Sequence, residues 1–158
     1  MPMGLTNVTT YLWFDGRAQE AAEFYVSLFP ESQLGAMSHY PDDAPHLPGE
    51  VLVVEFQIFG RPFAILNGGP GFPHTEAVSF QVACDTQEDV DALWEALIAN
   101  GGEPGRCGWC KDRFGVSWQV IPKELGELLG HSDPTISGYA MGQMMQMNKI
   151  IVADLRRP

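Results

Sequence analysis

The 158-residue sequence predicts an α+β fold made of paired βαβββ modules that form a curved mixed sheet with helices outside. Short stretches of alternating apolar and polar residues predict strands, because successive strand side chains point to opposite faces. Two stretches with apolar residues at three- and four-residue steps each predict a helix. The order of one strand, one helix and further strands occurs twice, so two similar modules are expected.

The chain is long enough for one domain with a proper core and too short for two ordinary domains. We therefore treat residues 1–158 as a single domain with three parts. These are a first module at about 6–70, a second at about 76–122, and a C-terminal helical tail at about 123–158.

The first module begins with a predicted strand at residues 8–14 and a helix at 17–29. Three further strands are expected, at residues 32–40, 51–59 and 62–66. A short turn at Gly60-Arg61 is expected to join the last two strands. Residues 41–50 contain three prolines, two aspartates and a histidine, so they form either a lid over the sheet or a plain surface loop.

The second module begins with a predicted strand at residues 77–84. A helix follows, with Asp85 or Thr86 as its N-cap and Gly101-Gly102 as its stop signal. Two strands are expected at residues 103–111 and 116–121. The apolar side chains that predict the helix are Val90, Leu93, Trp94, Leu97 and Ile98.

The segment Cys107 to Pro122 is the most informative part of the chain, because it predicts two strands joined by a tight turn at residues 112–115. After the turn, Val116, Trp118 and Val120 alternate with the more polar series Ser117, Gln119 and Ile121. A period of two places Trp118 in the core and Gln119 on the opposite face.

The tail carries two predicted helices, at residues 123–129 and 136–147. The second helix is rich in methionine, which packs adaptably against irregular surfaces. It either packs on its own domain or across a dimer, or it binds a flexible partner. The residues concerned are Tyr139, Met141, Met144, Met145 and Met147.

Composition excludes several classes of partner. A net charge of −11, with nine scattered Lys and Arg residues, opposes binding to nucleic acid or to an anionic membrane. No window approaches the roughly 20 apolar residues of a membrane span, and no export signal opens the chain. We therefore expect a cytoplasmic protein whose three cysteines are reduced.

Several motifs give the sequence a family resemblance from about residue 6 to residue 151. They are residues 11–16 (YLWFDG), 21–25 (AAEFY), 67–70 (NGGP), 77–82 (AVSFQV) and the segment 107–122. With these motifs the chain resembles the PhnB-like branch of the vicinal oxygen chelate superfamily, which is often labelled 3-demethylubiquinone methyltransferase-like. The resemblance implies the glyoxalase/bleomycin resistance/dioxygenase fold, but one fold hosts many chemistries.

Metal-dependent members of this superfamily hold a divalent ion with His or Glu at four strand positions. In this sequence the positions correspond to Thr9 or Thr10, Ala64, Ala77 and Gln119. An alanine has no donor atom, and an amide oxygen is a much weaker ligand than a carboxylate. We therefore expect neither a metal nor another cofactor.

Two other motifs resemble a redox or zinc site and an S-adenosylmethionine site, but the predicted secondary structure around each motif argues against that function. Cys107 and Cys110 have C-x-x-C spacing, but they lie in or beside a predicted strand and not at a helix N-terminus, so a structural role is favoured over a redox or zinc site. Residues 67–71 are rich in glycine, but Phe72-Pro73 cannot begin the helix of an S-adenosylmethionine site. Methyl transfer is therefore disfavoured.

The remaining inward side chains predict a pocket for a small organic ligand, with aromatic walls and a few amides and hydroxyls. Alternating polar residues are also typical of a solvent-facing strand, so this interpretation depends on the fold enclosing the face. The predicted lining is Tyr11, Trp13, Glu55, Gln57, Ser79, Gln81, Ser117 and Gln119, with Asn67, Phe72, Trp109 and Lys111 at its ends.

Three functions are compatible with these residues. The leading hypothesis is a metal-free homodimer that binds or sequesters a small molecule. The second is an enzyme of isomerase, lyase or hydrolase type with Glu55 as general base and Lys111 or Tyr11 as polarising group. The third is a structural or regulatory dimer.

Overall fold

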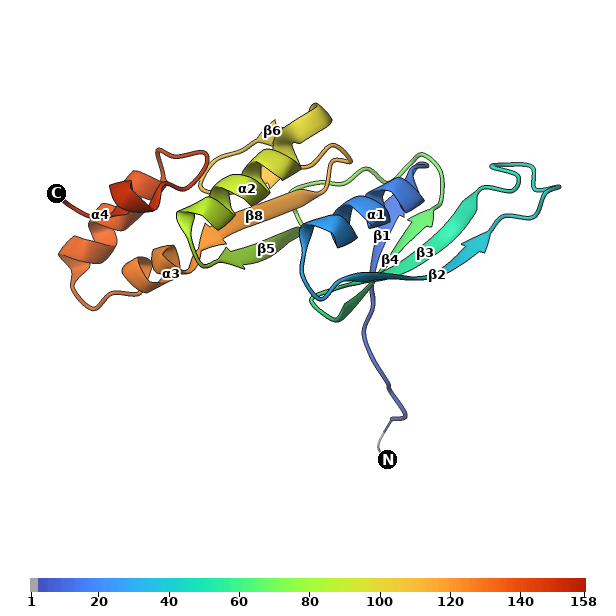
Figure 1. The fold of residues 1–158 in the computed structure, drawn as a ribbon, viewed down its shortest axis with the longest axis horizontal. Helices are drawn as coiled ribbons and strands as arrows, with labels where there is room; N and C mark the ends of the chain where they lie inside the picture. Colours follow the sequence, from blue (N-terminus) through green and yellow to red (C-terminus); the bar gives the residue numbers. More distant parts are fainter. Residues whose placement is uncertain (1–2) are drawn as a thin grey trace. The chain divides into compact units, whose positions relative to one another are not determined.

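The computed structural model describes residues 3–158 and divides the chain into two compact units, residues 1–73 and 74–158. Each unit has one four-stranded mixed sheet with a long helix on one face (Figure 1). The predicted α+β fold with paired βαβββ modules is confirmed. The strands are distributed over two sheets, one in each unit.

The first unit has the sheet order β1-β4-β3-β2, with β1 and β4 parallel and the other pairs antiparallel. Its elements are β1 (Thr10–Phe14), α1 (Ala18–Leu28), β2 (Gln33–His39), β3 (Val51–Ile58) and β4 (Arg61–Asn67). All five predicted elements of this module are confirmed to within two residues at each end.

The core of the first unit lies between α1 and one face of its sheet. Tyr25 of α1 is 1% exposed and stacks on Phe56 of β3, with ring centroids 6.1 Å apart. Phe56 in turn stacks on Phe63 of β4 at 5.4 Å. Side chains of Leu12 and Ile65, which are partners in the β1–β4 register, complete this face.

The hairpin between β3 and β4 turns at Phe59-Gly60, one residue before the predicted turn at Gly60-Arg61. Both residues have left-handed backbone angles, with φ of 49° and 71°. Two successive left-handed residues match the twist of the flanking strands in a two-residue loop. Arg61 is therefore the first residue of β4.

The second unit repeats the topology, with the order β5-β8-β7-β6 and a parallel β5–β8 pair. Its sheet elements and long helix are β5 (Ser79–Cys84), α2 (Gln87–Ile98), β6 (Glu103–Pro104), β7 (Trp109–Lys111) and β8 (Ser117–Pro122). Thr86 is the N-cap of α2, because its side chain accepts a hydrogen bond from Asp89 N while the Asp89 carboxylate accepts one from Thr86 N.

The prediction of one strand at residues 103–111 is wrong, because these residues form a hairpin. Glu103 pairs with Lys111 and Pro104 with Cys110, so the chain reverses between them. Cys107 and Gly108 have φ of 57° and 81°, which are turn conformations. The two arms of this hairpin are β6 and β7. They occupy the positions in the second sheet that β2 and β3 occupy in the first.

The carboxylate of Asp112 organises the turn between β7 and β8. Its Oδ1 accepts hydrogen bonds from Phe114 N at 2.8 Å and Val116 N at 3.1 Å, and its Oδ2 accepts one from Trp118 Nε1 at 2.8 Å. Asp112 is 2% exposed. The predicted alternation in β8 is confirmed, since Trp118 is also 2% exposed and Gln119 lies on the other face.

The C-terminal tail packs as part of the second unit. α3 (Lys123–Leu129) has the predicted bounds, whereas α4 (Pro134–Met144) begins two residues before the predicted start and ends three before the predicted end. The reason for the earlier start is that Asp133 caps α4 and Pro134 suits its first turn. Leu125, Leu128, Ala140, Ile150 and Leu155 form a buried cluster between the helices and the tail.

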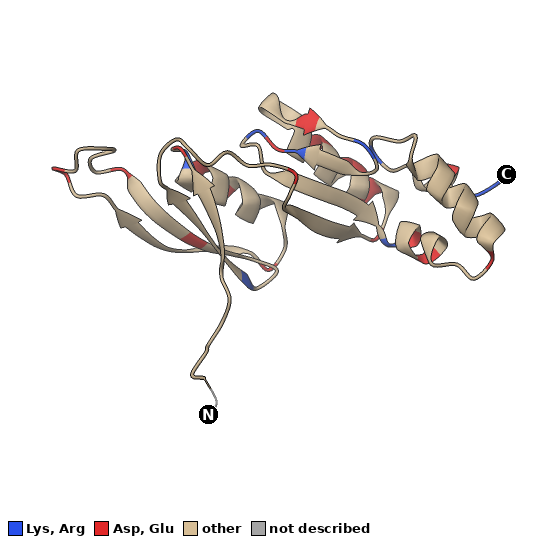
Figure 2. Cartoon of the chain, turned by 180° about the vertical axis from the view of Figure 1, so that it is seen from behind, with Lys and Arg blue, Asp and Glu red and all other residues tan. Residues whose placement is uncertain are grey.

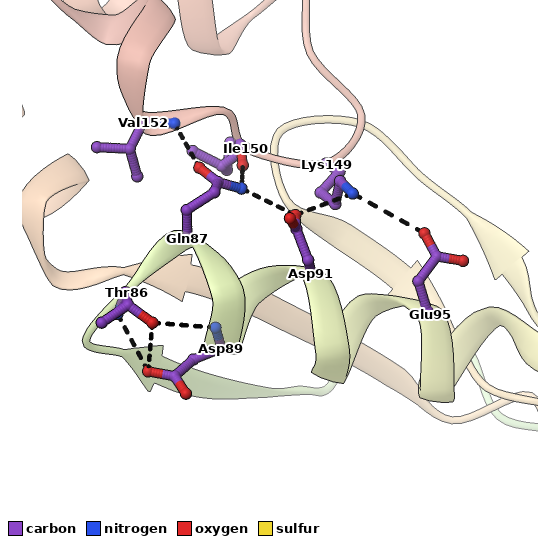
Figure 3. A network of polar contacts seen from close by, with 8 residues as sticks. All are labelled: Thr86, Gln87, Asp89, Asp91, Glu95, Lys149, Ile150 and Val152. Atoms are coloured by element: carbon purple, nitrogen blue, oxygen red, sulfur yellow. Dashed lines mark hydrogen bonds and ion pairs between the residues drawn. The ribbon is translucent and has the colours of Figure 1, made fainter.

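Figure 3 shows how the segment after α4 is attached to α2. The Gln87 side chain donates a hydrogen bond to Ile150 O at 3.0 Å and accepts one from Val152 N at 2.8 Å. Lys149 forms an ion pair with Asp91 at 2.9 Å. These contacts join residues more than 55 positions apart and fix the path of the chain end.

We predict opposite stability effects for two neighbours in β8. Trp118→Ala removes a buried ring and the Asp112 hydrogen bond, so it should reduce the free energy of unfolding by about 3–5 kcal/mol. Gln119→Ala truncates a half-exposed side chain, so it should change the free energy of unfolding by no more than about 1 kcal/mol. Urea unfolding of both variants measures the difference. Equal losses would contradict the assignment of the two faces.

Candidate functional site

The sheet of the first unit has an open face on the side opposite α1. Tyr11 and Glu55 both pair with Ala64 in the strand register, so their side chains share this face. Tyr11 is 57% exposed and Glu55 is also exposed. The sequence-predicted residues Tyr11, Glu55 and Gln57 are therefore brought together on one surface.

These three residues line a concavity of about 220 Å³, which we call the Glu55 pocket. Its other walls come from the segment before β1, from β2 and from β4. The lining residues that the sequence analysis did not identify are Asn7, Thr9, Gln33, Leu34, Gly35, Phe56, Pro62 and Phe63. Drug-sized ligand sites span roughly 300–1,000 Å³, so this pocket suits a smaller molecule.

The lining of the Glu55 pocket combines one carboxylate, amides and aromatic surface. Gln33 Nε2 donates a hydrogen bond to Gln57 Oε1 at 3.5 Å, which links β2 to β3 across the pocket wall. Gly35 lies against Glu55, and a side chain at this position would approach Glu55 O to 3.2 Å. Glycine therefore lets β2 lie close to the backbone of Glu55.

Trp13 and Phe72 form a separate aromatic pair in the first unit. Trp13 Nε1 donates a hydrogen bond to Gly69 O at 2.8 Å, and its ring meets that of Phe72 edge-on at 4.9 Å. Phe72 is 67% exposed. Neither ring lines the Glu55 pocket, so the structure does not bring Trp13 and Phe72 together with Tyr11 and Glu55.

Asn67 has a structural role in this unit. It is 4% exposed, accepts a hydrogen bond from Ala18 N at 3.2 Å, and donates one to Val51 O at 2.9 Å. Its amide therefore joins the first residue of α1 to the start of β3. Because both ends of this amide are bonded to the backbone, Asn67 does not offer a polar group to a ligand.

The sheet of the second unit also has an open polar face, on the side opposite α2. Gln81 Nε2 donates to Gln119 Oε1 at 3.2 Å, and Gln119 Nε2 donates to Ser79 Oγ at 2.8 Å. The three predicted residues thus form one hydrogen-bonded chain across β5 and β8. Trp109 lies opposite Gln119 in the β7–β8 register.

Ser117 lies on the same face, between Ser79 and Lys111 in the register. Its side chain is buried, and its Oγ has no hydrogen-bond partner among residues 3–158. Lys111 forms an ion pair with Glu76 at 2.6 Å, and this hydrogen bond raises the pKa of Lys111. The ammonium group is therefore held as a cation by a neighbouring carboxylate.

The four positions that correspond to metal ligands do not provide a metal-binding donor set. Ala64 is fully buried in β4, Ala77 precedes β5, and neither has a donor atom. The Gln119 amide is bonded to Gln81 and Ser79. Among residues 3–158, no group of three or more His, Cys, Asp or Glu side chains is arranged to hold a metal ion.

Two of the three cysteines, Cys84 and Cys110, occupy environments that oppose redox chemistry. Burial raises the pKa of the Cys84 thiol to about 11 and that of Cys110 to about 12, and nearby aspartates act in the same direction. Cys107 is half-buried in the turn before β7. A thiol with so high a pKa is almost entirely protonated near pH 7, whereas the thiolate is the reactive form.

The glycine-rich segment after β4 does not lead into a helix. Gly69 and Gly71 have positive φ, and the next helix, α2, begins at Gln87 after β5. A methyltransferase site of the doubly wound type needs a helix directly after such a turn. This arrangement supports the interpretation of residues 67–71 as a bend at the end of β4.

Comparison with known proteins gives the family. The profile of the 3-demethylubiquinone-9 3-methyltransferase family matches residues 6–121, most of the chain. The chain belongs to this family. Its members are the PhnB-like proteins of the vicinal oxygen chelate superfamily. A search of curated proteins gave no match.

Solved structures support the same assignment. A PhnB protein from Bacillus cereus is 32% identical, with a TM-score of 0.68, over 74% of this chain and 99% of that one. A Pseudomonas aeruginosa protein is 22% identical, with a TM-score of 0.60, over 75% of this chain and 98% of that one. The fosfomycin resistance protein FosX from Mesorhizobium loti shares the fold at 17% identity and a TM-score of 0.54, over 83% of this chain and all of that one.

The match to the PhnB-like family ends in β8, so residues 122–158 lie beyond it. This segment contains α3, α4 and the chain end. No helix among residues 3–158 is long and apolar enough to cross a membrane.

We predict that one thiol per chain reacts readily with a disulfide reagent in the native PhnB-like protein. Cys84 and Cys110 are buried and have raised pKa values, so Cys107 should react first. Titration with 5,5′-dithiobis(2-nitrobenzoate) at pH 8 should give one fast equivalent, and Cys107→Ser should abolish it. Unfolded protein should give all three. Three fast native equivalents would contradict the described burial.

Proposed function

We propose that this PhnB-like protein binds or sequesters a small organic molecule, and that the Glu55 pocket supplies a binding surface for it. The observation that carries the proposal is the convergence of Tyr11, Glu55 and Gln57 in one concavity. An exposed aromatic ring provides contact area, while the carboxylate and amides orient a polar ligand. The ligand class that fits is a small ring-containing molecule with hydrogen-bond donors.

The open face of the second unit supports the same proposal independently. Ser117 itself is buried, so the groups of this face that a ligand would meet are the exposed Gln81 amide and the half-buried Gln119 and Trp109 side chains. The neighbouring Gln119 and Ser79 groups are already ordered by their mutual hydrogen bond.

The binding proposal predicts a specific pattern of variants. Tyr11→Ala should remove aromatic contact area, and Glu55→Gln should remove the acceptor charge, so each should weaken binding by about tenfold or more. A thermal-shift screen of small metabolites with the whole protein identifies hits, because a ligand at 100 times its Kd stabilises by about 2.7 kcal/mol. Calorimetric titration of each hit then measures the Kd of the variants.

Glu23→Gln is the matched control, because Glu23 is an exposed carboxylate on α1 and lies outside the Glu55 pocket. It should bind each hit as the unchanged protein does. Hits whose affinity is the same for Tyr11→Ala, Glu55→Gln and Glu23→Gln would reject the Glu55 pocket as their site.

We further propose that binding needs no metal, because the positions of the superfamily's ligands hold threonine, alanine and glutamine in this chain. A stable site for a divalent ion requires a full set of suitable donors. Elemental analysis of protein purified without chelator should find less than stoichiometric zinc, iron, manganese and nickel. One equivalent of any of these metals per chain would overturn the proposal.

An enzyme with Glu55 as general base is the second candidate, and one observation favours it. Glu55 and Tyr11 line the same pocket, so a carboxylate and a phenol could address one bound substrate. Lys111, the other predicted polarising group, is bonded to Glu76 in the second unit. Conversion of a hit by the unchanged protein, followed by NMR and abolished in Glu55→Gln, would favour this candidate over simple binding.

We also propose that the protein is a homodimer in the cytoplasm. Exposed apolar side chains on β2 and on and after α4 provide apolar surface, namely Leu34, Met37, Met141 and Met145. A two-fold interface would cover such surface. Light scattering at micromolar concentration should give about twice the chain mass of 17.4 kDa. A mass of one chain would refute the dimer.

A further inference from the structure

The C-terminal tail contains a second and larger concavity, which we call the Arg157 pocket. It has a volume of about 440 Å³ and lies between α3, α4 and the chain end. Its apolar wall includes Leu128, Ile136 and Tyr139, and its polar wall includes His131, Arg156 and Arg157. This volume is within the usual range for small-molecule sites, roughly 300–1,000 Å³.

The Arg157 pocket is built on ordered structure. Leu128 and Leu155 are 6% and 1% exposed and belong to the buried cluster of the tail. The Gln87 side chain donates a hydrogen bond to Ile150 O and accepts one from Val152 N, and these bonds hold the segment that leads to Leu155 (Figure 3). A pocket whose walls are already packed loses little entropy when a ligand binds.

The charge of this pocket differs from that of the chain as a whole. The net charge is −11, yet the chain end is basic, as Figure 2 shows. Arg156 pairs with a carboxylate, since its Nε donates a hydrogen bond to Glu124 at 2.7 Å. Arg157 instead places its guanidinium over the Tyr139 ring, 5.5 Å from the centroid.

The acidic groups near this pocket are Glu124, which pairs with Arg156, together with Asp133 and Glu127. Asp133 uses its Oδ1 to accept hydrogen bonds from Thr135 N at 2.9 Å and Thr135 Oγ1 at 2.7 Å, so it serves as the cap of α4. Glu127 is the one carboxylate among the lining residues; of the two lining arginines, Arg156 pairs with Glu124 and Arg157 lies over the Tyr139 ring. His131 adds a hydrogen-bond donor, because its Nδ1 accepts a bond from Asp133 N and its other nitrogen then carries the proton.

We propose that the Arg157 pocket binds a small aromatic monocarboxylate. The carboxylate would bind the guanidinium of Arg157, which forms strong charge-assisted hydrogen bonds with such groups. The aromatic part would pack on Ile136 and Leu128, and Tyr139 would hold the guanidinium in place. Because residues 122–158 lie beyond the match to the PhnB-like family, this site is an addition to the family's common domain.

The test uses the full chain and a defined probe, 2-naphthoate, with neutral 2-naphthamide as its uncharged counterpart. Calorimetric titration should show saturable binding of naphthoate and at least about tenfold weaker binding of the amide, because the amide lacks the charge that Arg157 recognises. In ¹⁵N-resolved NMR spectra, the largest shifts should fall in residues 127–157. Absence of saturable naphthoate binding, or equal affinities for the two probes, would overturn the proposal.

Two arginine variants make the test specific to the pocket. Arg157→Gln should weaken naphthoate binding by at least about tenfold, whereas Arg106→Gln should leave it unchanged, since Arg106 is exposed in the turn before β7 and outside the pocket. Equal effects of both substitutions would reject a specific site. Largest shifts in residues 3–73 would place the probe in the first unit and would also reject it.

Discussion

The buried carboxylate of Asp112 is the interaction on which the second unit depends. It receives two backbone N–H groups of the β7–β8 turn and the indole N–H of Trp118, so it fixes both the turn and the register of β8. A shift of one residue in a strand would move every side chain to the other face. The polar surface formed by Ser79, Gln81 and Gln119 therefore exists because Trp118 is held in the core.

Asn67 has a comparable role in the first unit, where one amide joins the end of β4 to α1 and β3. Both units thus use one buried polar side chain to connect a sheet to its neighbours, and both leave the opposite sheet face open. Buried polar groups stabilise a structure only when their hydrogen bonds are satisfied, and these two groups satisfy that condition. The polar side chains that remain accessible to solvent, such as Glu55 and Gln81, lie on the open faces.

The common PhnB-like domain and the C-terminal tail have different electrostatic characters. The common domain presents carboxylates and amides, with Glu55 in its pocket. In the tail, Arg156 and Arg157 line a separate pocket. A chain with two such surfaces could hold a neutral or donor-rich molecule in one and an anion in the other.

The sequence by itself determined the elements, the α+β class and the faces of the strands, because alternation and helical periodicity are local patterns. It predicted Tyr11, Glu55 and Gln57 on one face, but it did not identify Gln33, since β2 is exposed along its whole length and shows no clear alternation. It also placed Asn67 at a ligand site and missed the β6–β7 hairpin. Only the tertiary structure decided these points and the Arg157 pocket, because hydrogen bonds and packing contacts between distant residues create them.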